Sequence, residues 1–357
     1  MKPILRRTLL FAAALYLLLG LSPLVLRLAA AQPAQAAPSP SASASPAPEA
    51  DGAAAFRIYD EARAQVLTVP DADFLRGALP CEMALDAPDE ALKAQAIAIY
   101  TFYSARRLQN TGGDADFTCN SAEKQIYMTD DDLAALYGES WDEAKARLDA
   151  ICAEVSGQQL LYDGAPIEAT FFAISAGCTQ PYENVWGEKS YPYLQAVACP
   201  SDMLYDGYQT STAVTPDAVR EAFPDVQYTD DPAGWFTDAR CFEGGYVESI
   251  SLCGTALSGT AVREALGLRS ASFTVTFADG VFTFTTLGYG HGVGMSQAGA
   301  IYMAENGSVC AEILAYFYPG ATLSAERARR FPAAPEYPDE KGRPKRSGPE
   351  ANGLISP

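Results

Sequence analysis

The alternation of hydrophobic and polar residues along the chain predicts four helices. One is predicted over residues 88–108, where apolar residues recur at helical spacing after an early proline and first-turn acids. A second is predicted over 141–156 and ends at Gly157. Two more are predicted near the C-terminus, over 295–305 and 311–317. These helices lie at both ends of the part of the sequence that can form a core.

Strand patterns fill the middle of the chain. A hairpin is predicted where Asp163-Gly164 joins residues 160–162 to a strand over 167–174. Further strands are predicted over residues 247–252, 272–277 and 281–286, the last two joined across 278–280. Strands and helices do not alternate regularly, so we expect an α+β fold with mixed, largely antiparallel sheets and packed helices rather than a parallel α/β sheet.

The two ends of the chain differ in composition from the middle. Residues 8–26 carry no charge and follow a basic start, which is typical of an export signal, and their length favours a transmembrane anchor over a cleaved signal. The alternative is cleavage after the Ala34-Gln35-Ala36 sequence. Either way, the rest of the chain lies outside the cytoplasm. We therefore divide the chain into a cytoplasmic stub and transmembrane anchor (1–31), a disordered Ala/Pro/Ser linker (32–55), a folded domain forming a substrate cleft (56–325) and a disordered tail (326–357).

Charge and cysteine spacing exclude several classes of function. The net charge of −19 disfavours nucleic-acid binding, because contacts to phosphates require Lys and Arg. The eight cysteines include no C-x-x-C pair, which excludes zinc ribbons and zinc fingers, and His291 is the only histidine. An exported domain with an even number of cysteines permits disulfides, but the spacing does not define their pairing.

Four segments stand out from this background. Taken together and in this order, they resemble the stage II sporulation protein D family, whose domain is shared with the amidase enhancer proteins. The glycine-rich segment around His291 is the most specific of them, and the resemblance covers residues 56–325. The segments are Leu79-Pro80-Cys81-Glu82-Met83 with Ala91-Leu92-Lys93-Ala94-Gln95-Ala96, residues 171–179 with Asn184-Val185-Trp186, residues 261–268, and residues 288–300.

The resemblance implies a membrane-anchored lytic transglycosylase. Such an enzyme cuts the glycan strands of peptidoglycan with 1,6-anhydromuramyl ends, here during engulfment of the forespore, and needs no cofactor. The implied location is the cell membrane, crossed once, with the C-terminal domain outside the cytoplasm, and the implied partners are the glycan strands and stage II sporulation proteins P and M. The alternatives are a non-catalytic amidase enhancer that binds peptidoglycan, or a structural wall-binding module.

Glu82 is the candidate catalytic residue. It is expected in a turn with apolar sequence neighbours, where desolvation would raise the pKa of its carboxyl group and suit it to general acid chemistry. From the residues alone, Glu82 could equally cap the following helix or lie in a solvated loop. The resemblance places it on the catalytic glutamate of the family.

Seven further residues are candidates for substrate binding. Five of them also have a structural alternative: a solvated helix face for Lys93 and Gln95, a bare turn for Ser175 and Thr179, and a loop-stabilising role for His291. The candidates are Lys93, Gln95, Ser175, Thr179, His291, Ser296 and Gln297.

Two departures from the family pattern bear on the site. Tyr100 stands where the family's helix carries an arginine, which changes the charge near the acid. Some members bind zinc through a His-Cys pair that follows a cysteine, but here Glu123-Lys124 follows Cys119 in place of that pair. One thiol cannot supply the four ligands that zinc requires, so we predict no metal site.

Overall fold

The computed structural model describes residues 55–122, 124–187 and 189–324. The predicted anchor and tail, and all of the predicted linker except Ala55, lie outside these residues. Within the described ranges, no helix is both long enough and apolar enough to cross a membrane. All eight cysteines are described, and each is a free thiol rather than half of a disulfide.

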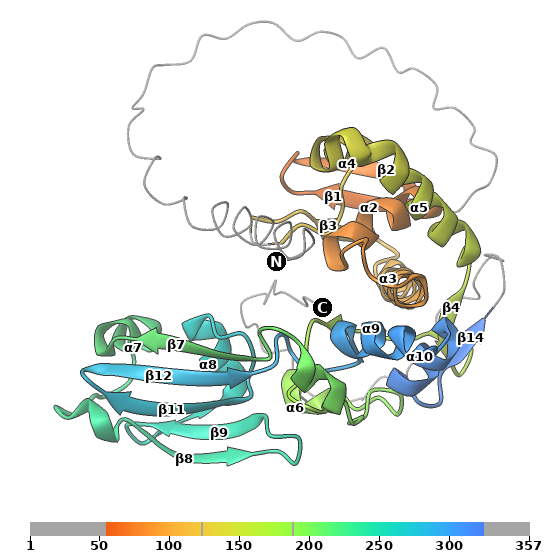
Figure 1. Cartoon of the computed structure of the whole chain (residues 1–357). Coiled ribbons are helices and arrows are strands. Elements are labelled where there is room, and N and C mark those ends of the chain that lie inside the picture. Colours follow the sequence, from red (N-terminus) through yellow and green to blue (C-terminus); the bar gives the residue numbers. More distant parts are fainter. Residues whose placement is uncertain (1–54, 123, 188, 325–357) are drawn as a thin grey trace, which may run out of the picture. The chain divides into compact units, whose positions relative to one another are not determined.

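A first hydrophobic core is organised around one long helix, α3 (Asp89–Gln109). Fourteen of its 21 residues are buried, so it is surrounded by other elements rather than lying on the surface. Helices and three small sheets complete this core (Figure 1). The helices are α2 (Asp71–Glu82), α4 (Asp130–Tyr137), α5 (Trp141–Glu154), α9 (Gln297–Glu305) and α10 (Cys310–Phe317). Of these, α2, α5, α9 and α10 contact α3 directly.

The sheets of the first core are short. The first has strand order β2-β1-β3, the second β14-β4-β5, and the third contains only β13 and β6. The strands are β1 (Ala55–Asp60), β2 (Gln65–Pro70), β3 (Phe117–Cys119), β4 (Gln159–Tyr162), β5 (Ala165–Pro166), β6 (Phe171–Phe172), β13 (Met295–Ser296) and β14 (Thr322–Ser324).

A second, smaller core forms between two three-stranded antiparallel sheets. Their orders are β11-β12-β7 and β10-β9-β8 (Figure 1). Buried aromatic residues such as Trp235, Phe282 and Phe284 pack in this core. Its elements are β7 (Gln209–Val214), α7 (Pro216–Ala222), β8 (Phe236–Cys241), β9 (Val247–Leu252), β10 (Thr255–Ser258), α8 (Gly259–Leu266), β11 (Phe273–Ala278) and β12 (Val281–Leu287). Short helical segments connect the rest: η1 (Gly138–Ser140), α6 (Glu183–Trp186), η2 (Pro200–Leu204) and η3 (Pro232–Gly234).

The second core is an insertion into the first. The chain enters the second core at β7 and leaves it after β12, where the Gly288 N–H donates to the Tyr208 carbonyl at 2.7 Å. The departing and returning ends of the insertion are therefore hydrogen-bonded to each other. In the first core, β6 pairs in parallel with β13, with Met295 opposite Phe171 and Ser296 opposite Phe172, and β13 leads directly into α9.

Most elements predicted from the sequence are confirmed. The α+β class, the helices α3, α5 and α10 and the strands β9, β11 and β12 fall where the pattern placed them, within one or two residues. The helix predicted from residue 295 begins at Gln297, because Met295 and Ser296 form β13.

The strand predicted over 167–174 is wrong. Only Ala165–Pro166 and Phe171–Phe172 are strands in this region. Between them, the N–H groups of Ala169 and Thr170 donate to carbonyls two residues earlier, at 2.9 Å in each case. These tight turns replace the ladder that the apolar pattern suggested.

Candidate active site

Glu82 is the last residue of α2, and its side chain is largely withdrawn from water, with 13% of its surface exposed. The turn predicted around it is wrong, because the helix continues through Pro80 and ends only at Met83, whose backbone is extended. Pro80 has no N–H to donate, but the Met83 N–H still bonds to the Leu79 carbonyl at 3.0 Å. The carboxyl group is thus placed by a helix end, which is a more rigid support than a loop.

The carboxyl group of Glu82 faces a single cation. Burial raises its pKa to about 7, and the ammonium group of Lys124 opposes this shift from a distance of 3.7 Å between Nζ and Oε1. Burial in turn lowers the pKa of Lys124. Protonated and ionised forms of Glu82 therefore coexist near neutral pH, as a group that must donate and then accept a proton requires.

Lys124 was missed as a site residue by the sequence analysis. It lies in the connection between β3 and α4, where the Asn120 side-chain oxygen accepts hydrogen bonds from the N–H groups of Ile126 and Tyr127, each at 3.0 Å. Its Nζ is buried and makes no hydrogen bond to the described residues. The only signal in the sequence is its place in the segment after Cys119, where Glu123-Lys124 replaces the zinc-binding His-Cys pair of some family members.

Two glutamines join Glu82 from different helices. Gln297, at the start of α9, donates from Nε2 to the Glu82 backbone carbonyl at 3.0 Å and to Gln95 Oε1 of α3 at 3.4 Å. The Gln95 side chain is fully buried, and its Nε2 has no hydrogen-bond partner in the described part of the chain. An unpaired buried donor costs free energy, so Gln95 is a group from which a polar ligand could accept a hydrogen bond.

His291 is held in the glycine-rich loop as a neutral ring. Its Nδ1 accepts a hydrogen bond from the Val293 N–H at 3.1 Å, so the proton of the neutral ring resides on Nε2. Burial, together with the positive charges of Arg263 and Lys124, lowers its pKa to about 3. Trp186 packs against the imidazole with ring centres 4.9 Å apart. His291 is therefore not the acid of this site.

Glycine is required in this loop for reasons of space. Gly292 and Gly294 both have positive φ, at 81° and 82°. A Cβ at Gly294 would overlap the Thr170 carbonyl, and one at Gly292 would overlap the ring of Tyr246. The close approach of the loop to the residues before β6 fixes the position of His291.

Comparison with known proteins identifies the family. A family model described as "Stage II sporulation protein" matches residues 59–162, which include Glu82, Gln95 and Lys124. Stage II sporulation protein D of Bacillus amyloliquefaciens is 32% identical over 270 residues, covering 75% of this chain and 78% of that protein. The chain belongs to the stage II sporulation protein D family. The protein of the same name from Bacillus subtilis is 31% identical over 270 residues, covering 75% of this chain and 78% of its own length.

A more distant relative carries a different name. The protein named "Amidase enhancer" from Bacillus subtilis is 26% identical over 303 residues, covering 70% of this chain and 40% of that protein. The resemblance proposed from the motifs is thus confirmed at the level of the stage II sporulation protein D family.

Three of the candidate hydroxyl groups are committed to internal hydrogen bonds. Ser296 donates to Asp202 Oδ2 at 2.6 Å and caps α9 by accepting from the Gly299 N–H at 3.2 Å. Thr179 donates to the Gln195 carbonyl at 3.0 Å, and the Ser175 hydroxyl accepts from the Gly177 N–H at 3.2 Å. All three residues are fully buried. The structure gives them a part in holding the loops, and a part in substrate binding remains a prediction.

Lys93 and Tyr100 point to partners other than Glu82. Lys93 forms ion pairs with Glu90 and Glu154, and hydrogen bonds to these carboxylates raise its pKa. Tyr100 donates to Asp71 Oδ2 at 2.6 Å. Two carboxylates compensate the charge of Lys93, so Lys124 rather than Lys93 is the lysine beside the carboxyl group of Glu82.

The residues in the zinc-binding region of the family do not fit a metal here. Lys124 contributes a positive charge, and burial raises the pKa of Cys119 to about 12, which keeps its thiol protonated. In the three described ranges, no group of three or more His, Cys, Asp or Glu side chains could hold a metal ion. Zinc ligands must be deprotonated, which this environment opposes.

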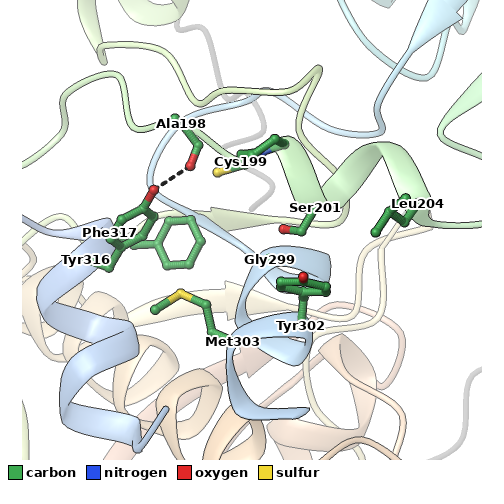
Figure 2. A pocket seen from close by; sticks show the side chains of 10 residues that line it. Ala198, Cys199, Ser201, Leu204, Gly299, Tyr302, Met303, Tyr316 and Phe317 are labelled. Carbon is green, nitrogen blue, oxygen red and sulfur yellow. Dashed lines mark hydrogen bonds between the residues drawn. The ribbon is translucent and has the colours of Figure 1, made fainter. Parts of the chain in front are cut away.

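A separate cavity of about 420 Å³ is lined by α9, α10 and the η2 segment. Figure 2 shows that its wall is mostly aromatic and apolar, with Tyr302 and Met303 from α9 and Tyr316 and Phe317 from α10. Tyr316 is fixed there by a hydrogen bond to the Ala198 carbonyl at 2.6 Å. Neither Glu82 nor Lys124 lines this cavity, so it is distinct from the candidate active site.

The tight approach at Gly294 predicts a stability effect. We expect Gly294→Ala to lower the free energy of unfolding by more than about 3 kcal/mol, because the new methyl group would overlap a buried backbone carbonyl. Urea unfolding followed by circular dichroism measures this free energy of unfolding. Gly280→Ala is the matched control, since Gly280 has φ 78° but open space around its Cβ position, and it should cost only about 1 kcal/mol. Equal losses in the two variants would contradict the steric explanation.

The poor fit for zinc predicts that chelation has no effect. The purified full-length protein should contain no stoichiometric zinc by elemental analysis, and its midpoint of thermal unfolding should be the same with and without EDTA. A fall in the midpoint that added zinc reverses would show that the site binds a metal.

Proposed function

We propose that this protein is a lytic transglycosylase that cuts peptidoglycan glycan strands and leaves 1,6-anhydromuramyl ends. The observation that carries this proposal is Glu82, a single buried carboxyl group with a pKa of about 7. Lys124 is the only charged side chain of the described residues that shifts this pKa. Hydrolysis of a glycosidic bond by water ordinarily uses two carboxyl groups, and this arrangement supports chemistry that needs one.

One carboxyl group is enough when the substrate supplies its own nucleophile. Protonated Glu82 donates its proton to the glycosidic oxygen, and the bond from this oxygen to C1 of the muramic acid breaks. The 6-hydroxyl of the same sugar then attacks C1, and its proton passes to the Glu82 carboxylate. The carboxyl group is restored and no water is consumed, so Glu82 ends the cycle in the protonation state in which it began.

Lys124 favours the ionised state in the middle of this cycle. Once Glu82 has given up its proton, its carboxylate lies 3.7 Å from the ammonium group and is largely withdrawn from water. An opposite charge at this distance stabilises a carboxylate. Burial and Lys124 thus act in opposite directions, which keeps proton donation and proton uptake both accessible.

The neighbouring groups are suited to holding a sugar. Gln95 and Gln297 lie beside Glu82, and the unpaired Nε2 of Gln95 can donate to a hydroxyl or acetamido oxygen. His291 is neutral and packs against Trp186, so it can contribute a hydrogen bond without adding charge. These three residues are the proposed substrate-binding set around the acid.

Family membership supports a function at the cell wall during sporulation. We extend it to a role in engulfment of the forespore, to stage II sporulation proteins P and M as partners, and to anchoring in the cell membrane by residues 1–31. The competing function is that of an amidase enhancer, which the relative of that name supports. The reaction product separates the two functions, because only cleavage of the glycan strand creates anhydromuramyl ends.

The role of Glu82 is tested by Glu82→Gln. The amide keeps the shape of the side chain but has no carboxyl proton, so release of anhydromuramyl ends should fall by about 10²–10⁴-fold. Mass spectrometry of muropeptides measures this loss. Glu248→Gln, the same change at an exposed position of β9, should cleave at the unmutated rate. A Glu82→Gln protein that still produces anhydro ends at that rate would favour the amidase enhancer function or another acid.

The role of Lys124 is tested by the pH dependence of cleavage. The reaction starts from protonated Glu82, so the rate should decline as the pH rises through about 7. Lys124→Met removes the charge that lowers this pKa, and the declining limb should move to higher pH by about 1–3 units. Lys145→Met, which removes a partly exposed lysine paired with Asp149, should leave the limb in place. A limb that does not move in Lys124→Met would show that Lys124 has no influence on the acid.

A further inference from the structure

Two arginines near the glycine-rich loop lack the partners that other arginines of this acidic protein have. Arg263 and Arg269 make no ion pair or hydrogen bond through their side chains to the described residues, and the Nε atom of each is buried without a partner. Most other described arginines pair with a carboxylate, namely Arg57, Arg63, Arg76, Arg106, Arg107, Arg147 and Arg220. Arg240, on β8, is also unpaired among the described residues but is exposed to solvent.

Arg269 is fixed in position without an acidic partner. Its guanidinium carbon lies 4.2 Å from the centre of the Tyr289 ring. On another side it lies close to Gly207, where a Cβ atom would come within 3.3 Å of Nη1. The backbone carbonyl of Arg269 accepts a hydrogen bond from the Gly290 N–H at 2.8 Å, which ties the arginine to the glycine-rich loop. A guanidinium held over an aromatic ring keeps its N–H edge free for a planar anion.

Arg263 faces the same loop from α8. Burial lowers its pKa, and the titratable groups within electrostatic reach are Glu264, Tyr289 and Tyr246. Glu264 does not approach to ion-pair distance. The positive charges of Arg263 and Lys124 both lower the pKa of His291, and Lys124 lies beside the carboxyl group of Glu82. Through His291, Arg263 is within electrostatic reach of the candidate active site.

We propose that Arg263 and Arg269, together with Tyr289, form an anion-binding subsite that takes a carboxylate of the glycan strand. The proposal rests on the function proposed above. Guanidinium groups bind carboxylates through paired hydrogen bonds, and Tyr289, which is 47% exposed, offers a ring surface beside them. Each muramic acid carries a lactyl carboxylate that is free where the stem peptide has been removed, and stem peptides carry carboxylates of their own. The subsite places a negatively charged strand on a protein whose net charge of −19 would otherwise repel it.

The test measures binding to glycan strands whose carboxylates are intact or converted to neutral methylamides. The full-length chain with Glu82→Gln is used in detergent, so that no substrate is consumed. Peptide-free and peptide-bearing strands are each compared in both forms. We expect amidation to weaken binding of at least one type of strand by about tenfold or more, because it removes a pair of charge-assisted hydrogen bonds. The strand type that shows the loss identifies the source of the carboxylate.

Variants assign the effect to the two arginines. Adding Arg263→Gln and Arg269→Gln should weaken binding of the carboxylate form and abolish the effect of amidation. Arg240→Gln, which removes one positive charge on β8, should retain the effect. Equal affinity for both forms of both strand types, in the chain with native arginines, would overturn the proposal and requires no further variant. An amidation effect that persists without the two arginines would also overturn it. Carboxylate-dependent binding by the Glu82→Gln chain, together with no release of anhydromuramyl ends by the chain with Glu82 intact, would refute the transglycosylase function and leave the subsite standing.

Discussion

The parallel pairing of β6 with β13 is the constraint on which the arrangement of the site depends. Only two residues on each strand take part, yet they join segments more than 120 residues apart in the chain. The pairing brings the glycine-rich loop against Thr170 and lets α9 begin at Gln297, next to Glu82. Gly294 is what allows so close an approach. Without this short pairing, the loop that carries His291 and the helix that carries Gln297 would have no fixed relation to the acid.

Within that frame, the properties of Glu82 come from a balance between solvation and charge. Removing a carboxyl group from water favours its neutral form, and a nearby ammonium group favours its ionised form. Neither effect alone gives a group that can both donate and accept a proton near neutral pH. At 3.7 Å and without a direct hydrogen bond, Lys124 is close enough to lower the pKa of Glu82. The Glu82 carboxyl group is left free to form a hydrogen bond to a ligand.

The sequence predicted the regular elements well and the site only in part. Long helices such as α3 and hairpins with an Asp-Gly turn are encoded locally, so their patterns were sufficient. The strand predicted over 167–174 failed, because residues 167–170 form tight turns that an apolar run does not reveal. Glu82 was found through its motif, but Lys124 was not. Its distance to Glu82 depends on how the connection after β3 folds back, and this is a tertiary contact between positions 42 residues apart that no local pattern encodes.

The insertion of the second core between paired strands has a consequence for how such a protein can diversify. Because the chain enters the second core at Gln209 and leaves it at Leu287, and the flanking Tyr208 and Gly288 are hydrogen-bonded to each other, the second core is a self-contained insertion. Its hairpins can lengthen, shorten or change their surface without changing the supports of Glu82 and Gln95, which belong to α2 and α3. The part of the molecule that carries Glu82 and the part that carries Arg263 and Arg269 can thus vary independently of each other.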